Sequence, residues 1–292
     1  ALEHPNVVQV HDSGITEDGR PYLVMSYIEG RSLGEILEEE DRLEPERAIR
    51  IFSQVCDALA HAHHKGVVHR DLKPNNIMLV KTEASTDVVK IVDFGIAKLV
   101  APDGTDTQTL TRTGETFGSP WYMSPEQCLA QRLDSRSDIY SLGCVMYHAL
   151  TGKPPLAGES AFETMTFHVS KKPRPFKSVR PDLGVQPELE RVVRVAMEKI
   201  PEERWQSMTE FRDQLLGASR HEGVRTMGVA TQRMSVAGRK PRGSKARMIK
   251  TLLLIPALVI IFAEVFKPGS VQRVATDGMR VCERLWERVV KR

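Results

Sequence analysis

The sequence predicts an α+β fold, in which a few short strands are followed by a longer and mostly helical part. Strand patterns come first: alternating apolar residues at 7–10 and 22–28, then short apolar runs at 77–80 and 88–92. Helical spacing of apolar residues fills four longer segments: 45–65, 138–150, 189–197 and 208–216. With 292 residues, 41% of them hydrophobic, the chain is long enough to bury a core.

The boundaries of the first elements are marked by local signals. Asp18-Gly19 separates the first two strands and predicts the turn of a β-hairpin. Ser32 is followed three residues later by Glu35, the pattern of a capping box at a helix start. The helix expected over 45–65 begins at a proline and is followed by Gly66.

A group of histidines invites a metal hypothesis, which the spacing does not favour. His63 and His64 are adjacent in sequence and cannot share one helix face. No cysteine or carboxylate is spaced for tetrahedral ligation with His61 or His69.

Charge divides the chain into an acidic body and a basic tail. Residues 1–217 carry 25 Lys and Arg against 33 Asp and Glu, whereas residues 218–250 carry 9 against 1. The basic pI of the chain therefore describes the tail and not the body. The cysteines Cys56, Cys128, Cys144 and Cys282 show no paired spacing, which is typical of a reducing, cytosolic setting.

Residues 69–76 and 93–95 carry the chemistry. They read His-Arg-Asp-Leu-Lys-Pro-Asn-Asn and Asp-Phe-Gly. Asp71 can accept the proton of an attacking hydroxyl, and Lys73 can contact a phosphate as a point charge. Asn76 and Asp93 supply the oxygen ligands that magnesium prefers. Phosphoryl transfer needs these groups, because it depends on positioning and on neutralising phosphate charge.

These two blocks resemble the catalytic loop and the metal-binding motif of eukaryotic-type protein kinases, H-R-D-x-x-x-x-N and D-F-G. The match is ungapped within each block, and the interval of 22 residues from Asp71 to Asp93 suits a short β-hairpin. The resemblance implies a protein-kinase-like fold with a mostly helical large lobe, and ATP and Mg²⁺ as cofactors. Lysine at Lys73 favours Ser and Thr hydroxyls over Tyr as acceptors.

Residues 1–28 resemble the end of the kinase small lobe and the hinge. The chain opens at Ala1 without a methionine, so the resemblance places the glycine-rich loop, the strand lysine and its partner glutamate upstream, and the fragment alone is expected to be inactive. Met25 would be the gatekeeper behind adenine, Ser26 and Ile28 would offer it backbone groups, and Met78 would lie beneath the ring.

The residues from Asp93 to Glu126 resemble a kinase activation segment, with Ser-Pro-Glu where the family usually has Ala-Pro-Glu. Thr111 and Thr113 match positions that bacterial members autophosphorylate, and a phosphate there would face Arg70. A merely flexible threonine-rich loop is the alternative. Ser119 is placed to hydrogen-bond Asp71 and Lys73 beside the target hydroxyl.

Four positions match residues with structural roles in the family. His69 is expected to pack under the catalytic loop, and the Asp138 carboxylate is expected to accept backbone N–H groups of that loop. Glu126 and Arg204 resemble the buried ion pair that fastens the activation segment to the large lobe.

The basic tail contains one strongly apolar segment. Residues 249–266 are predicted to form a single transmembrane helix, although the uninterrupted apolar run is 13 residues, and an interfacial or core helix is the alternative. Basic residues before it orient the kinase side toward the cytoplasm. Nucleic-acid binding by the linker is disfavoured because residues 218–248 hold no aromatic side chain for base stacking.

The whole pattern looks most like a bacterial membrane-anchored receptor-type Ser/Thr kinase, because 13 residues separate Thr113 from Glu126 and a single-pass tail is predicted. The implied organisation is a small-lobe remnant, large lobe, basic juxtamembrane linker, membrane helix and short amphipathic tail: 1–28, 29–217, 218–248, 249–266 and 267–292. Protein substrates are implied, and a homodimer for autophosphorylation in trans is allowed.

Two other functions stay open. The first is a pseudokinase that acts as a membrane-tethered scaffold, because the strand lysine is not within the sequence. Finding that lysine upstream would distinguish an active kinase from a pseudokinase. A small-molecule phosphotransferase is the other, and the long threonine-bearing segment disfavours it.

Overall fold

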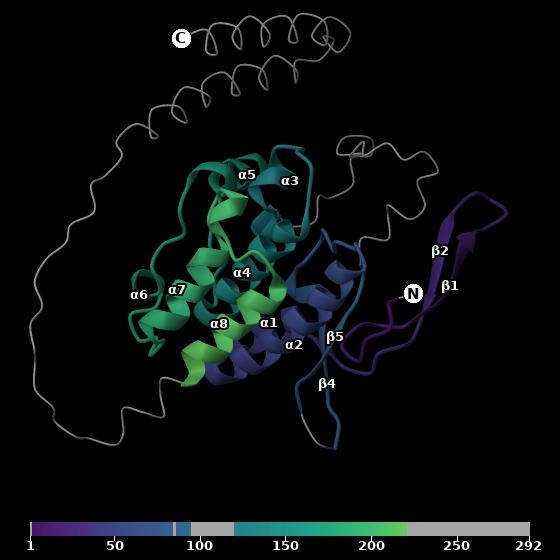
Figure 1. Cartoon of the computed structure of the whole chain (residues 1–292), viewed down its shortest axis with the longest axis horizontal. Helices are drawn as coiled ribbons and strands as arrows, with labels where there is room; N and C mark the ends of the chain where they lie inside the picture. Colours follow the sequence, from purple (N-terminus) through teal and green to yellow (C-terminus); the bar gives the residue numbers. More distant parts are fainter. Residues whose placement is uncertain (1, 84–85, 95–119, 221–292) are drawn as a thin grey trace, which may run out of the picture. The chain divides into compact units, whose positions relative to one another are not determined.

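The computed structural model describes residues 2–83, 86–94 and 120–220. Figure 1 shows a body of helices with two small β-sheets beside it. The antiparallel hairpin of β1 (Val10–Ile15) and β2 (Pro21–Met25) turns at Gly19, whose φ of 81° is one that glycine adopts without strain. The second sheet has the order β3-β4-β5, from β3 (Arg31–Ser32), β4 (Ile77–Val80) and β5 (Val88–Ile91).

The first strand differs from the sequence prediction. It begins at Val10 instead of Val7, and the second strand ends at Met25 instead of Ile28. Val7 forms a parallel bridge with Ile91 of β5, and the Val8 N–H donates to the Ile91 carbonyl at 2.9 Å. Val7 and Val8 are buried there, so their apolar character reflects packing against β5 and not the hairpin.

The longer helices include the four that the apolar spacing predicts, one that begins at the predicted Ser32 cap and one over 161–170 that the sequence did not predict; two short helices and three 3₁₀ turns join them in the described part of the chain. The long ones are α1 (Leu33–Glu40), α2 (Pro45–His64), α4 (Ser135–Thr151), α5 (Ala161–Ser170), α7 (Pro187–Ala196) and α8 (Met208–Arg220). The short ones are α3 (Pro125–Cys128), α6 (Phe176–Val179) and the 3₁₀ turns η1 (Pro74–Asn76), η3 (Pro120–Tyr122) and η4 (Pro201–Glu203). Ser32 caps α1 through the expected capping box with Glu35. Helix α8 continues past the predicted boundary at Gly217 to Arg220.

Helix α4 lies at the centre of the core. From Ser137 onward almost all of its residues are buried, including polar ones, which is typical of a helix surrounded on every side. Gly143 allows α7 to approach, because a Cβ there would lie 2.9 Å from the Ala196 Cβ. Because α4 is packed on all sides, it gives rigid support to loop residues that hydrogen-bond to its N-terminal end.

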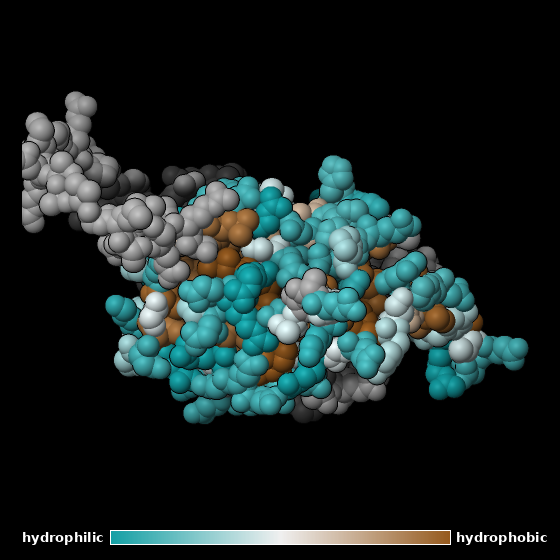
Figure 2. Space-filling view, turned by 90° about the horizontal axis from the view of Figure 1, so that it is seen from below, coloured by the Kyte–Doolittle hydropathy of each residue, from teal (hydrophilic) through white to brown (hydrophobic). Residues whose placement is uncertain are grey.

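The surface is mixed in polarity. Figure 2 shows a largely hydrophilic face on which hydrophobic residues gather in a few places. The hairpin contributes several exposed apolar side chains, among them Ile15 (60% exposed) and Val24 (45% exposed).

Within the described residues, no helix has the length and apolar character needed to cross a membrane. The predicted membrane helix at 249–266 and the tail at 267–292 lie outside the described part of the chain.

Candidate active site

The loop that carries Asp71 is fastened to the N-terminal end of α4. The Asp138 carboxylate accepts the N–H groups of His69 (2.8 Å) and Arg70 (2.9 Å), and it also contacts His63 Nε2 of α2 at 2.7 Å. Asp138 is 1% exposed, and a buried carboxylate requires such partners. The sequence placed Asp138 and His69 here, whereas His63 was considered only as a metal ligand.

His69 lies beneath the loop as a neutral ring. Burial lowers the pKa of His69, although the nearby charge of Asp138 acts in the opposite direction. A neutral ring fits its contacts, in which Nε2 donates to the Val92 carbonyl (3.0 Å) and Nδ1 accepts the Asp71 N–H (3.3 Å). The ring also lies against Phe94, with 4.7 Å between ring centroids. His69 thus links the two motif blocks.

Asp71, Lys73 and Asn76 share one small region. Lys73 Nζ lies 2.7 Å from Asp71 Oδ2, and Asn76 Nδ2 donates to the Asp71 main-chain carbonyl at 2.8 Å. Because Nδ2 of the Asn76 amide is directed at the Asp71 carbonyl, the oxygen of the same amide points away from that carbonyl. The Asp71 carboxylate remains well exposed (58% of the side chain), as a group that receives a substrate proton must be.

Asp93 reaches the same region through the β4–β5 pair. Strand β4 begins directly after Asn76, β5 ends two residues before Asp93, and Ile77 is opposite Ile91 in the register. The Val92 N–H donates to the Asn76 carbonyl at 3.0 Å. The two predicted metal ligands are therefore held beside each other by main-chain pairing.

Two site residues have left-handed backbones that glycine usually supplies. Arg70 has a φ of 70° and Asp93 a φ of 57°. Such conformations cost about 1–3 kcal/mol and persist where the surroundings fix them, which happens often at functional sites. Asp93 is one of the predicted catalytic residues, and Arg70 directly precedes another, Asp71.

Of the four residues predicted to contact adenine, Met25 and Met78 lie on strands, whereas Ser26 and Ile28 follow the end of β2. Met25 ends β2, and Met78 lies in β4 between Ser32 and Lys90. The Ser26 N–H already donates to the Gln9 carbonyl at 2.9 Å. A cavity of about 800 Å³ is lined by residues 26–29, which include Ser26 and Ile28, and by residues 2–4, 7–9, 80–81 and 90. Neither Met25 nor Met78 lines it, so it is not the space between those two side chains.

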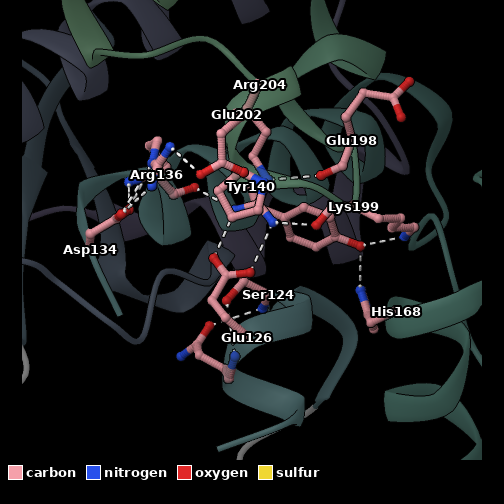
Figure 3. A network of polar contacts seen from close by, with 12 residues as sticks. Ser124, Glu126, Asp134, Arg136, Tyr140, His168, Glu198, Lys199, Glu202 and Arg204 are labelled. Atoms are coloured by element: carbon pink, nitrogen blue, oxygen red, sulfur yellow. Dashed lines mark hydrogen bonds and ion pairs between the residues drawn. The ribbon is translucent and has the colours of Figure 1, made fainter. Parts of the chain in front are cut away.

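Glu126 and Arg204 form a buried, bidentate ion pair, shown in Figure 3. The two Arg204 terminal nitrogens lie 2.7 and 2.8 Å from the Glu126 oxygens, and Arg204 also donates to the carbonyls of Glu198, Arg136 and Lys199. Burial raises the pKa of Glu126, but the hydrogen bonds and charge of Arg204 outweigh it and hold that pKa below the usual range.

A chain of polar groups beside this pair was missed from the sequence. Lys199 Nζ lies 2.8 Å from the Tyr140 hydroxyl, which in turn lies 2.9 Å from His168 Nδ1 (Figure 3). Burial lowers the pKa of Lys199 to about 8. The three residues of this polar chain come from different elements: Tyr140 from α4, His168 from α5 and Lys199 from the loop after α7. Their spacing in the sequence gives no sign that they meet.

The predicted regulatory residues Thr111, Thr113 and Ser119 lie outside the described residues. In the ranges 2–83, 86–94 and 120–220, no group of three or more His, Cys, Asp or Glu side chains could hold a metal ion. The Asn76–Asp93 pair is a different arrangement. An amide oxygen and one carboxylate fit Mg²⁺, which usually takes one or two carboxylates together with substrate phosphates.

Comparison with known proteins identifies the family. Residues 1–216 match the model of the protein kinase domain, so the chain belongs to the protein kinase family. It is 40% identical over 246 residues to the serine/threonine-protein kinase pkn3 of Myxococcus xanthus, and 42% identical over 226 residues to the serine/threonine-protein kinase PknB of Mycolicibacterium smegmatis. These alignments cover 84% and 76% of this chain, which spans only 43% and 34% of the two relatives.

A solved structure agrees with this assignment. The kinase domain of PknI from Mycobacterium tuberculosis aligns with a TM-score of 0.57 at 25% identity, over 75% of this chain and 74% of that one. The predicted α+β, protein-kinase-like fold is therefore confirmed, and the relatives are bacterial Ser/Thr kinases, as the sequence indicated.

Proposed function

We propose that this chain is the catalytic part of a protein kinase that transfers the γ-phosphate of ATP to serine and threonine hydroxyls of proteins. One observation carries the proposal: the hydrogen bonds from Asn76 to Asp71 and from Val92 to Asn76 gather Asp71, Asn76 and Asp93 at one end of the β4–β5 pair. The names of the bacterial relatives support the Ser/Thr assignment.

In this mechanism Asp71 accepts the proton of the attacking hydroxyl. The hydroxyl oxygen bonds to the γ-phosphorus, the bond to the β,γ-bridging oxygen breaks, and ADP leaves. Lys73, which lies 2.7 Å from Asp71, neutralises charge on the moving phosphate. Asn76 and Asp93 would hold Mg²⁺, which would neutralise the charge that develops on the phosphate oxygens.

The adenine contacts extend the proposal to the strands. Because the Ser26 N–H is bonded to Gln9, we assign its carbonyl, together with the Ile28 backbone, to the adenine edge. Met25 then lies behind the base and Met78 beneath it. We expect the Met78→Phe variant, with its larger side chain, to have a higher KM for ATP and little change in kcat.

The regulatory and membrane parts of the proposal concern residues outside the described ranges. Phosphorylation of Thr111 and Thr113, in trans within a homodimer, adds charge that pairs with Arg70 and orders the segment. Residues 249–266 anchor the protein as a single-pass helix with the kinase part in the cytoplasm. Mass spectrometry of phosphosites and fractionation of membranes test these two parts separately.

The central test uses the full-length protein, radiolabelled ATP and a protein substrate such as myelin basic protein. We expect Asp71→Asn to lower kcat by at least about a thousandfold and Asp93→Ala to abolish transfer. Asp182→Asn is the matched control, because Asp182 is an exposed aspartate outside the site. Robust transfer by the Asp93→Ala variant would show that the assignment is wrong, and an inactive wild-type protein would favour the pseudokinase scaffold.

A further inference from the structure

Gln127 belongs to none of the sequence motifs and takes part in none of the proposed chemical steps. A role for Gln127 in the reaction rests on the proposed kinase function. Gln127 is the third residue of the short helix α3, half-buried, and its side chain makes two different bonds. Its oxygen accepts the Ser124 N–H at 2.9 Å, and its nitrogen donates to the Arg70 carbonyl at 2.6 Å.

The first of these bonds belongs to the start of α3. Ser124 and Gln127 form a capping box, in which the Gln127 N–H also donates to Ser124 Oγ at 3.3 Å. This end of the helix is firmly placed, because Ser124 is fully buried and the neighbouring Glu126 is held by Arg204. The amide group of Gln127 is oriented by the cap, since a flipped amide would set N–H against N–H.

The second bond completes a clamp on one residue of the catalytic loop, because the two peptide groups on either side of the Arg70 Cα are each held by a side chain. The Arg70 N–H is held by Asp138 at 2.9 Å and the Arg70 carbonyl is held by Gln127 at 2.6 Å. Arg70 has a strained φ of 70°, which needs such over-determination. The clamped carbonyl belongs to the Arg70–Asp71 peptide, so its rotation moves the Asp71 carboxylate.

We propose that Gln127 is a positioning residue for the phosphoryl-transfer reaction: it holds the Arg70–Asp71 peptide, so that correct placement of Asp71 depends on the docking of α3. Residues 125–128 then act on the reaction without touching the substrate. A displaced α3 releases the Arg70 carbonyl and lets the loop relax toward an unstrained backbone.

The experiment compares Gln127→Glu and Gln127→Ala in the full-length protein. Glutamate has the same shape and still accepts the Ser124 N–H, but its ionised carboxylate repels the Arg70 carbonyl. We expect kcat to fall about 10- to 100-fold in both variants, with the KM for ATP unchanged within about twofold. Gln131→Glu is the matched control, because Gln131 is an exposed glutamine four residues further along, and it should keep wild-type kcat.

Hydrogen exchange gives a readout independent of activity. Amides of residues 69–76 should exchange at least about tenfold faster in both Gln127 variants and at the wild-type rate in Gln131→Glu, while amides of α4 stay unchanged. Faster exchange throughout α4 would indicate a general loss of fold and would overturn the positioning role.

The outcomes separate this inference from the proposed function. If the wild-type protein transfers phosphate and both variants keep kcat within twofold, the clamp has no role and the kinase function stands. If the wild-type protein transfers nothing, the proposed function fails, and the exchange rates of residues 69–76 alone decide whether Gln127 holds the loop.

Discussion

At the scale of single residues, Arg204 shows how much one buried charge can hold. Its guanidinium bonds both oxygens of Glu126 and three main-chain carbonyls, and its side chain is fully buried. Replacing Arg204 with leucine leaves the Glu126 carboxylate buried without its partner. We expect the free energy of unfolding to fall by about 3–5 kcal/mol, measured by urea denaturation at pH 7.

Lysine is not expected to rescue this position, because an ammonium cannot bond both carboxylate oxygens in the same plane. Arg136→Leu is the comparison, since Arg136 pairs with the half-exposed Asp134 and should lose only about 1 kcal/mol. Equal losses in the Arg204→Leu and Arg136→Leu variants would contradict the importance of the buried pair.

Two neighbouring histidines make a second residue-scale test. His63 Nε2 contacts the buried Asp138 carboxylate at 2.7 Å, whereas His64 is exposed in the same helical turn. Removing the His63 ring deprives Asp138 of one of three partners, so His63→Leu should cost about 1–3 kcal/mol of stability. His64→Leu should change stability by less than about 0.5 kcal/mol. Thermal unfolding followed by circular dichroism measures both, and the reverse order would refute the contact.

At the scale of elements, the start of α1 offers a clean prediction. Ser32 Oγ accepts the Glu35 N–H at 3.1 Å. The Glu35 carboxylate accepts the Ser32 N–H and the Ser32 hydroxyl, and these two bonds lower the pKa of Glu35. Ser32→Ala should cost about 1 kcal/mol in urea denaturation. Ser32→Thr, which keeps the capping hydroxyl, should recover most of this loss; no recovery would mean that capping is not the cause.

Element by element, the sequence predicts what local chemistry decides. Helix α2 begins at Pro45 as expected, and β4 and β5 occupy the two apolar runs around the polar turn. The position of Val7 could not be predicted, because a parallel bridge to Ile91 depends on a contact between residues 84 positions apart in the chain. The strand period of 7–10 is the same whether its partner is the hairpin or β5.

The site shows the same division. Asp71, Asn76 and Asp93 are readable because a motif with known spacing carries them. The contact of Gln127 with the catalytic loop is not predictable in this way, although Ser124-x-x-Gln127 fits a capping box. The pattern explains the bond to Ser124, but only the fold brings the Arg70 carbonyl to the other side of the amide.

At the scale of the whole molecule, the half-buried His148 and the buried His168 make the fold sensitive to acid. Tyr122 and Tyr140 place their hydroxyls 2.7 and 2.9 Å from Nδ1 of His148 and His168. Burial lowers the pKa of His148 to about 4 and that of His168 to about 3. Between these values and 6.5, the ordinary pKa of a histidine, the unfolded chain binds more protons than the folded chain, so stability falls as the pH falls.

We therefore expect the free energy of unfolding to drop by roughly 2–4 kcal/mol between pH 6.5 and pH 5.0, at about 1.4 kcal/mol per pH unit for each histidine. Urea denaturation across this range measures the slope. A double variant, His148→Gln with His168→Gln, should be less stable at neutral pH but lose most of the slope. A slope unchanged in that variant would assign the acid sensitivity to other groups.

The bridge between the N-terminal segment and β5 has a mechanical consequence. The Ile91 N–H donates to the Asn6 carbonyl at 2.8 Å, and the Ile91 carbonyl accepts the Val8 N–H at 2.9 Å. Asp93 follows only two residues later, so a force applied to residues 6–8 is transmitted along two peptide units to its carboxylate. We therefore expect a change in the orientation of the segment that enters the β1–β2 hairpin to shift the carboxylate of Asp93, the predicted metal ligand.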